Sequence, residues 1–134
     1  MKILVIDDER IAAKLLTIYL NRQFEVECEI ACSCSDAITK FNEESYDFII
    51  LDLILPKGDS TICQSIILEG AYYTGLDLLV YFSQKNSNTH IVLCSTIPKY
   101  RIAVFIDKYC PSFACKLDQG YFDHIGEIIR NTAS

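Results

Sequence analysis

The stretch from Tyr46 to Pro56 constrains the fold of this chain more than any other part of its sequence. Phe48 to Leu51 is an unbroken apolar run, which is typical of a strand in a parallel sheet that helices cover on both faces. Asp52 interrupts this run, and a carboxylate buried there is costly without a charged partner. Pro56 lacks a backbone N–H and cannot continue a central strand. The sequence therefore predicts a buried strand that ends at Asp52, with this side chain in a crevice beyond the strand.

Segments of strand length alternate along the chain with segments of helical periodicity. Strands are expected over residues 2–6, 24–31, 48–51, 90–94 and 112–115, and helices over residues 11–21, 36–44, 75–84, 98–109 and 118–130. Such alternation predicts an α/β fold with a parallel sheet and right-handed crossovers. We expect a flavodoxin-like, doubly wound, five-stranded sheet in the order 2-1-3-4-5, with helices on both faces. A length of 134 residues suits a single domain spanning residues 1–134.

Composition and charge narrow the class of protein. The net charge of −6 argues against direct binding to nucleic acid or to an anionic membrane. No apolar stretch reaches transmembrane length, and the chain begins with a strand-like run instead of a signal peptide. We interpret most of the seven cysteines as small core residues in a reducing compartment, and no second ligand pair accompanies Cys32 and Cys34 at zinc-site spacing. These features predict a cytoplasmic protein.

Polar residues follow four of the five expected strands. They are Asp7 and Asp8 after the first, Asp52 after the third, Ser95 or Thr96 after the fourth, and Lys116 after the fifth. Parallel strands end at one edge of a sheet, and ligands bind there at the point where the strand order reverses, so we expect these side chains to converge. Three carboxylates repel one another unless a cation such as Mg²⁺ lies between them. With an ammonium and a hydroxyl beside it, Asp52 is a candidate to carry a phosphoryl group.

With these motifs the chain resembles the response-regulator receiver domains of two-component signalling. The resemblance runs over residues 2–130, and the matching segments are ILVIDDE (3–9), YDFIILDLILP (46–56), GLDLL (75–79), IVLCST (91–96) and the lysine at position 116. It implies that Asp52 accepts a phosphoryl group from a histidine kinase or a histidine phosphotransfer protein. Asp8, Asp52 and the backbone carbonyl of Ile54 would bind Mg²⁺, with Asp7 assisting.

The resemblance also implies how such a protein would act as a switch. Ser95 matches the switch hydroxyl, although Thr96 is an alternative one residue later, and Lys116 matches the phosphate-contacting lysine. Phe113 falls near the aromatic switch position. The output would be a change in the binding of a downstream protein partner. Such a protein assists its own phosphorylation and dephosphorylation but is not a turnover enzyme on an external substrate.

Two departures from the family pattern keep other functions open. Residues 57–74 are longer than the usual connection and are interpreted as an insertion before the third helix. Leu117 replaces the usual proline, and because a non-proline cis peptide is costly, we expect a trans bond after Lys116. An alternative is a receiver-fold interaction module that is not phosphorylated. A metal-dependent phosphatase is a third class, but those enzymes usually place a second acid two residues after the nucleophile, where this chain has Ile54.

Overall fold

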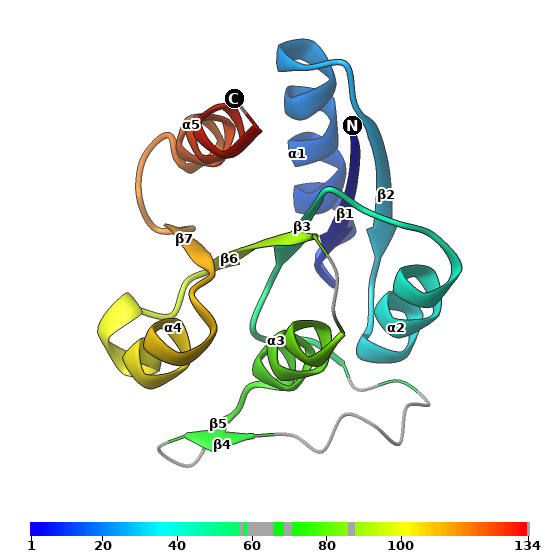
Figure 1. Cartoon of the computed structure of the whole chain (residues 1–134). Coiled ribbons are helices and arrows are strands. Elements are labelled where there is room, and N and C mark those ends of the chain that lie inside the picture. The colour runs from blue at the N-terminus through cyan, green and yellow to red at the C-terminus, as the bar shows by residue number, and fades with distance from the viewer. Residues whose placement is uncertain (57, 59–65, 69–70, 86–87, 134) are drawn as a thin grey trace.

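A five-stranded parallel sheet forms the centre of the molecule. The computed structural model describes residues 1–133 except for residues 57, 59–65, 69–70 and 86–87. The strands of the sheet are β1 (Lys2–Ile6), β2 (Glu27–Ala31), β3 (Phe48–Leu51), β6 (His90–Ser95) and β7 (Ser112–Cys115). They lie in the order β2-β1-β3-β6-β7, and every neighbouring pair is parallel (Figure 1). Because β4 and β5 belong to a separate pair, this is the predicted order 2-1-3-4-5, and the predicted fold class is confirmed.

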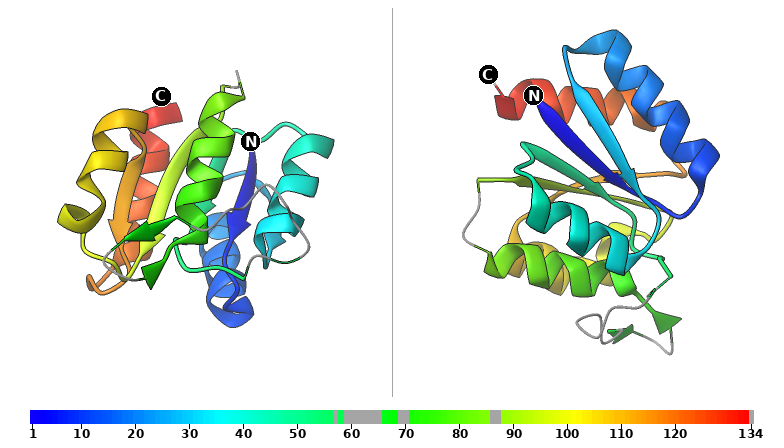
Figure 2. Two further views of the ribbon diagram at one scale, coloured as in Figure 1. Left: turned by 90° about the horizontal axis from the view of Figure 1, so that it is seen from below. Right: turned by 90° about the vertical axis from the view of Figure 1, so that its right-hand side faces the viewer.

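Helices cover both faces of this sheet. On one face lie α1 (Arg10–Gln23) and α5 (Tyr121–Ala133), and on the other lie α2 (Cys34–Glu43), α3 (Thr74–Gln84) and α4 (Ala103–Tyr109) (Figure 1 and Figure 2). The central strand β3 feeds both layers of the core. Phe48 and Ile50 pack with residues of α1 and α5, whereas Ile49 and Leu51 pack with residues of α2 and α3. The unbroken apolar run therefore has the cause that the sequence predicts, which is burial on both faces.

Three expected elements begin three or more residues later than predicted, whereas α1, α2 and α3 begin one or two residues earlier. The second strand starts at Glu27 instead of residue 24. The helix expected from residue 98 opens as a 3₁₀ turn (Lys99–Ile102) before α4, because Pro98 keeps an extended backbone. The last helix starts at Tyr121 instead of residue 118, after Gly120 with a positive φ of 74° that other residues rarely adopt. None of the described helices is long and apolar enough to cross a membrane.

The described part of segment 57–74 lies outside the main sheet. There, β4 (Ile67–Leu68) pairs with β5 (Ala71–Tyr72) in an antiparallel hairpin below α3 (Figure 1). The Tyr73 N–H donates to the carbonyl oxygen of Ile66 at 2.9 Å, and the Ile66 N–H donates to the Asp77 carboxylate at 3.0 Å. These bonds tie the hairpin to the first turns of α3. Residues 57, 59–65 and 69–70 fall outside the described residues, so both the insertion as a whole and the single domain stay predictions.

The cysteines are more exposed than the sequence suggested. Among the described ones, Cys34 and Cys94 are buried, whereas Cys28, Cys32 and Cys115 are half-buried and Cys110 is exposed. For the described cysteines, the prediction that most are core residues is wrong, and Cys63 lies outside the described residues. The physical reason is position, because these four lie on an edge strand or at the ends of strands and helices, where the helical layers cover less.

Candidate functional site

Backbone hydrogen bonds extend the parallel ladders one residue beyond the strand ends, and these bonds fix the site. The Asp7 N–H donates to the Ala31 carbonyl oxygen at 3.0 Å, and the Asp52 N–H donates to the Ile6 carbonyl oxygen at 2.9 Å. The Lys116 N–H donates to the Ser95 carbonyl oxygen at 2.9 Å. The residues after β1, β3 and β7 are therefore held at one edge of the sheet, as the strand order predicts.

At this carboxyl edge, one lysine lies between two carboxylates. The Lys116 Nζ is 2.7 Å from Asp7 Oδ2 and 3.1 Å from Asp52 Oδ2. The exposed fractions of these side chains are 13% for Lys116, 8% for Asp7 and 12% for Asp52. Charges held so far from water interact strongly, because solvent screens them poorly.

Burial changes how these groups hold protons. Desolvation raises the pKa of the Asp52 carboxyl from 3.8 to about 6; the nearby Lys116 charge opposes this rise and the Asp7 charge adds to it. Burial by itself lowers the pKa of Lys116, but the hydrogen bond to Asp7 and the charges of both carboxylates raise it above its ordinary value. Lys116 therefore stays a cation. Among the described residues, Lys116 is the one ammonium that pairs with these carboxylates, so an additional positive charge would be stabilised there.

The carboxylates of Asp7, Asp8 and Asp52 form a set of oxygen ligands. Their nearest oxygen atoms all lie within 4.8 Å of one another, and Asp8 is exposed while Asp7 is buried. An all-oxygen set with one ligand open to water suits Mg²⁺, which keeps several of its waters. The Ile54 N–H points back to Asp52 Oδ1 at 3.4 Å, and the Ile54 side chain is 50% exposed. The donor chemistry of these residues fits the predicted cation, and the role of the Ile54 carbonyl stays a prediction.

The two candidate switch hydroxyls differ in their surroundings. Ser95 is the last residue of β6 and is buried, and its Oγ accepts a hydrogen bond from the Ile97 N–H at 3.1 Å. Thr96 lies one residue beyond the strand and is exposed. Phe113 on β7 is half-buried and packs against the core layer that includes α3. The site therefore has a buried hydroxyl at a strand end beside Lys116, and the switch roles of these residues stay predictions.

Sequence reasoning missed the pairing of Asp7 with Lys116, since it gave Asp7 only an assisting role at the metal. The available signal was position: Asp7 directly follows β1 and continues its ladder, whereas Asp8 lies one residue further. Asp7 also accepts the Glu9 N–H through Oδ1 at 2.9 Å, so both of its oxygens have partners. The bond between Lys116 and Leu117 is trans, as expected, and the lysine still reaches both carboxylates.

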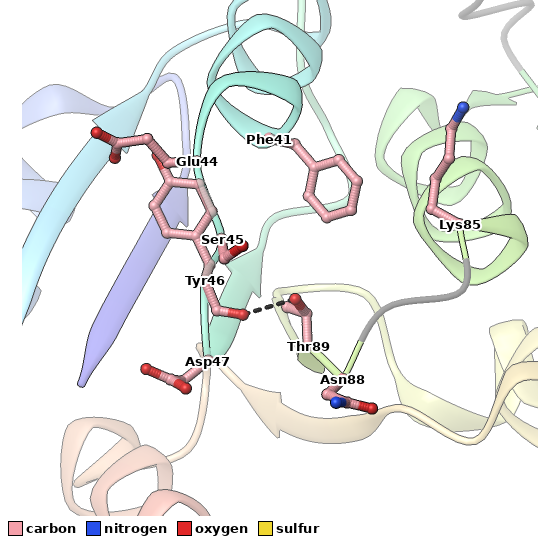
Figure 3. Close-up of a pocket in the computed structure, with 8 residues that line it drawn as sticks. All are labelled: Phe41, Glu44, Ser45, Tyr46, Asp47, Lys85, Asn88 and Thr89. Carbon is pink, nitrogen blue, oxygen red and sulfur yellow. Dashed lines mark hydrogen bonds between the residues drawn. The ribbon is translucent and has the colours of Figure 1, made fainter.

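A cavity of about 550 Å³ lies at the opposite, amino edge of the sheet. It is formed where α2 and α3 end and where β3 and β6 begin, and its lining comprises Phe41, Glu44, Ser45, Tyr46, Asp47, Lys85, Asn88 and Thr89 (Figure 3). Thr89 Oγ1 donates to the Tyr46 carbonyl oxygen across it at 2.6 Å (Figure 3). None of the predicted site residues lines this cavity, and most of the residues that do are exposed.

Comparison with known proteins identifies the family. Residues 3–105 match the response regulator receiver domain. The chain belongs to this family. The receiver is 41% identical over 66 residues to the transcriptional regulatory protein ResD of Bacillus subtilis, a match that covers 48% of this chain and 27% of ResD. It is 23% identical over 129 residues to the osmosensing histidine protein kinase SLN1 of Saccharomyces cerevisiae, covering 87% of this chain and 11% of SLN1.

A solved receiver structure resembles this one along its whole length. The response regulator protein TrrA of Thermotoga maritima, crystallised in complex with Mg²⁺ and beryllofluoride, superimposes with a TM-score of 0.74 at 25% identity. The match covers 97% of this chain and 96% of TrrA. The receiver thus spans almost all of TrrA but a minor part of ResD and of SLN1. Receiver domains are signalling modules and not turnover enzymes on external substrates.

Proposed function

We propose that this receiver accepts a phosphoryl group on Asp52 from a histidine kinase or a histidine phosphotransfer protein, in a reaction that depends on Mg²⁺. The observation that carries the proposal is the cluster at the carboxyl edge, where Lys116 Nζ lies 3.1 Å from Asp52 Oδ2 and Asp7 and Asp8 stand beside them. Phosphoryl transfer needs positioning and charge neutralisation more than covalent chemistry by the protein. This edge offers both.

In the proposed step, an oxygen of Asp52 attacks phosphorus and forms an O–P bond while the N–P bond of the phosphohistidine breaks. The bonding electrons stay on the imidazole, which takes up a proton from water. Lys116 lies close enough to Asp52 to neutralise part of the charge on the transferred group, and it remains a cation throughout. Bound Mg²⁺ would supply further neutralisation of the phosphoryl oxygens. Asp7 holds Lys116 in place from the other side at 2.7 Å.

The consequence of phosphorylation would be a change in partner binding. Ser95 Oγ is bonded to the Ile97 N–H and lies at the strand end beside the Lys116 backbone. A phosphoryl group on Asp52 offers this hydroxyl a charged acceptor, and charge-assisted hydrogen bonds are the stronger kind. We infer that Ser95 leaves Ile97 for the phosphoryl group and that Phe113 adjusts with it. A downstream protein would read that change in the cytoplasm.

The test is phosphorylation by a small donor. Incubation with Mg²⁺ and acetyl phosphate is expected to add one phosphate, measured by intact mass spectrometry, and Asp52→Asn is expected to abolish it. Asp47→Asn is the matched control, because Asp47 is an exposed acid at the amino edge of the same strand. Labelling that persists in Asp52→Asn contradicts the assignment. If neither the wild-type protein nor Asp52→Asn is labelled, and Asp52→Asn does not change partner binding, the receiver is the alternative, an unphosphorylated interaction module.

A further inference from the structure

The first turn of α3 lies directly against the backbone of the phosphoacceptor. The Gly75 N–H donates to the Leu53 carbonyl oxygen at 2.9 Å. A Cβ placed on Gly75 would overlap the carbonyl oxygen of Asp52, and it would lie 2.5 Å from Leu53 Cα and 2.9 Å from the carbonyl carbon of Asp52. Side-chain Cβ atoms essentially never approach other atoms within 3.0 Å. Space, and not backbone conformation, is therefore what reserves this position for glycine.

Neither side of this contact can move away easily. The neighbours of Gly75 in the first turn, Thr74 and Leu76, are 5% and 0% exposed, and Leu53 is 0% exposed. On its other side, the peptide of Asp52 is held to β1 by the hydrogen bond from its N–H to the Ile6 carbonyl oxygen at 2.9 Å. The Asp52–Leu53 peptide is thus clamped between β1 and α3. Because protein interiors are densely packed, an added methyl group at Gly75 would displace this peptide instead of fitting beside it.

We propose that Gly75 is a positioning residue for the phosphoacceptor, because the lack of a side chain there sets where the Asp52 carboxylate lies relative to Lys116 and Asp7. The inference rests on the function proposed above. The chain leaves Asp52 and returns to it at Gly75 only after the whole of segment 57–74. The contact made by α3, and not the length of the connection, therefore holds the Asp52–Leu53 peptide in place. This explains how the sequence can carry a long connection between Asp52 and Gly75.

The experiment compares two glycine-to-alanine variants. Gly75→Ala must push the Asp52–Leu53 peptide back by about 1 Å, and a misplacement of about that size can cost about 100-fold in rate. We therefore expect the initial rate of labelling by acetyl phosphate to fall about 100-fold and Mg²⁺ to bind more weakly. Gly126→Ala is the matched control. It adds the same methyl to another buried helical glycine, but the nearest atom is the Tyr19 hydroxyl oxygen at 3.2 Å, the far end of a side chain that can shift.

The readouts separate positioning from a purely structural role. Thermal unfolding, the Mg²⁺ dissociation constant and the labelling rate are measured on both variants below their unfolding temperatures. If Gly75→Ala only lowers the unfolding temperature and the folded protein is labelled at the wild-type rate, the inference is overturned. If the wild-type protein itself takes no phosphate, the proposed function fails instead, so the two failures are distinguishable.

A measurement on the wild-type protein covers the case in which Gly75→Ala does not fold. The amide resonance of Gly75 reports on its hydrogen bond to Leu53, because this N–H donates to the Leu53 carbonyl oxygen. Addition of Mg²⁺ and beryllofluoride, as a mimic of the phosphoryl group, is expected to shift the Gly75 resonance but not that of Gly126. An unchanged Gly75 resonance in the presence of the bound mimic would overturn the inference.

Discussion

The two edges of the central sheet carry similar ionic clusters in different surroundings. At the amino edge, Lys2 opens β1 and pairs with Glu44 and, at 3.8 Å, with Glu27. At the carboxyl edge, Lys116 follows β7 and pairs with Asp7 and Asp52. The acids at the amino edge are 43% and 73% exposed, whereas those at the carboxyl edge are 8% and 12% exposed. One lysine between two acids is thus found at both edges, and burial distinguishes them.

Burial strengthens the charge interactions at the carboxyl edge and shifts the pKa values of Asp52 and Lys116. At the amino edge, water and salt screen the charges, so the pairs contribute little to stability. At the carboxyl edge, desolvation raises the pKa of Asp52 to about 6, and Lys116 is required to hold two carboxylates in one place. Repulsion between two buried carboxylates that share one lysine destabilises the folded state. A bound cation or the loss of one negative charge relieves this repulsion. The comparison therefore predicts that equivalent changes at the two edges have unequal effects.

Removal of the lysine at each edge is expected to give the largest difference. Lys116→Met leaves the buried carboxylates of Asp7 and Asp52 without the cation that pairs with both, and we expect it to lower the free energy of unfolding by about 3 kcal/mol at neutral pH without Mg²⁺. Lys2→Met breaks pairs in which the acids are well exposed, and we expect a clearly smaller loss. Urea denaturation of both variants measures the difference. Equal losses would mean that the burial of the carboxyl-edge cluster has no energetic consequence.

Sequence reasoning locates the buried strands well because their positions depend on patterns that are local. The apolar run before Asp52 and the short run of Lys2 to Ile6 each identify a buried strand, and parallel strands then bring Asp7, Asp52 and Lys116 to one edge. Sequence reasoning fails where competing local preferences decide. Pro98 can begin a helix, but its extended backbone leads into a 3₁₀ turn instead.

Contacts between distant residues are the second kind of failure. The approach of Gly75 to the Asp52 backbone depends on how α3 packs after segment 57–74, and neither residue's neighbours in sequence reveal it. The same holds for the ion pair between Asp7 and Lys116, since three consecutive acids follow β1 and the sequence does not say which one the lysine meets. The motif identifies the residues of the site, but their partners follow from packing.

Magnesium should act at one edge and not at the other. A ligand that binds the folded state alone, present at about 100 times its Kd, stabilises that state by about 2.7 kcal/mol. We expect Mg²⁺ to raise the free energy of unfolding of the wild-type protein by up to this amount, because it relieves repulsion among Asp7, Asp8 and Asp52. Denaturation with Mg²⁺ or with a chelator measures the effect.

The acids at each edge provide the matched controls for this effect. Asp8→Asn removes an exposed member of the carboxyl-edge set, so it should weaken the stabilisation by Mg²⁺. Glu27→Gln removes an exposed acid at the amino edge, so it should leave the stabilisation unchanged. A loss of the Mg²⁺ effect in Glu27→Gln, with the effect retained in Asp8→Asn, would place the cation at the wrong edge for the proposed reaction.

The smallest expected effect concerns a titrating group at the amino edge. His90 opens β6, lies against the Phe48 ring and shares a 2.8 Å hydrogen bond with Ser112 Oγ, and burial lowers its pKa below 6.5. The unfolded chain therefore takes up this proton at a higher pH than the folded chain does. Stability from this group is present above about pH 6.5 and is lost as the pH falls below that value.

We expect His90→Gln to reduce the fall in unfolding free energy between about pH 7.5 and about pH 5.5 by less than about 1 kcal/mol, because a half-buried ring is partly solvated and one pKa unit corresponds to only 1.36 kcal/mol. Urea denaturation at both pH values gives the difference, and His124→Gln, an exposed position on α5, is the control. A pH dependence that is the same in His90→Gln and in the wild type would mean that water solvates the His90 ring equally well in the folded and the unfolded protein. In that case desolvation would be confined to the carboxyl edge, and the contrast between the two edges would be sharper still.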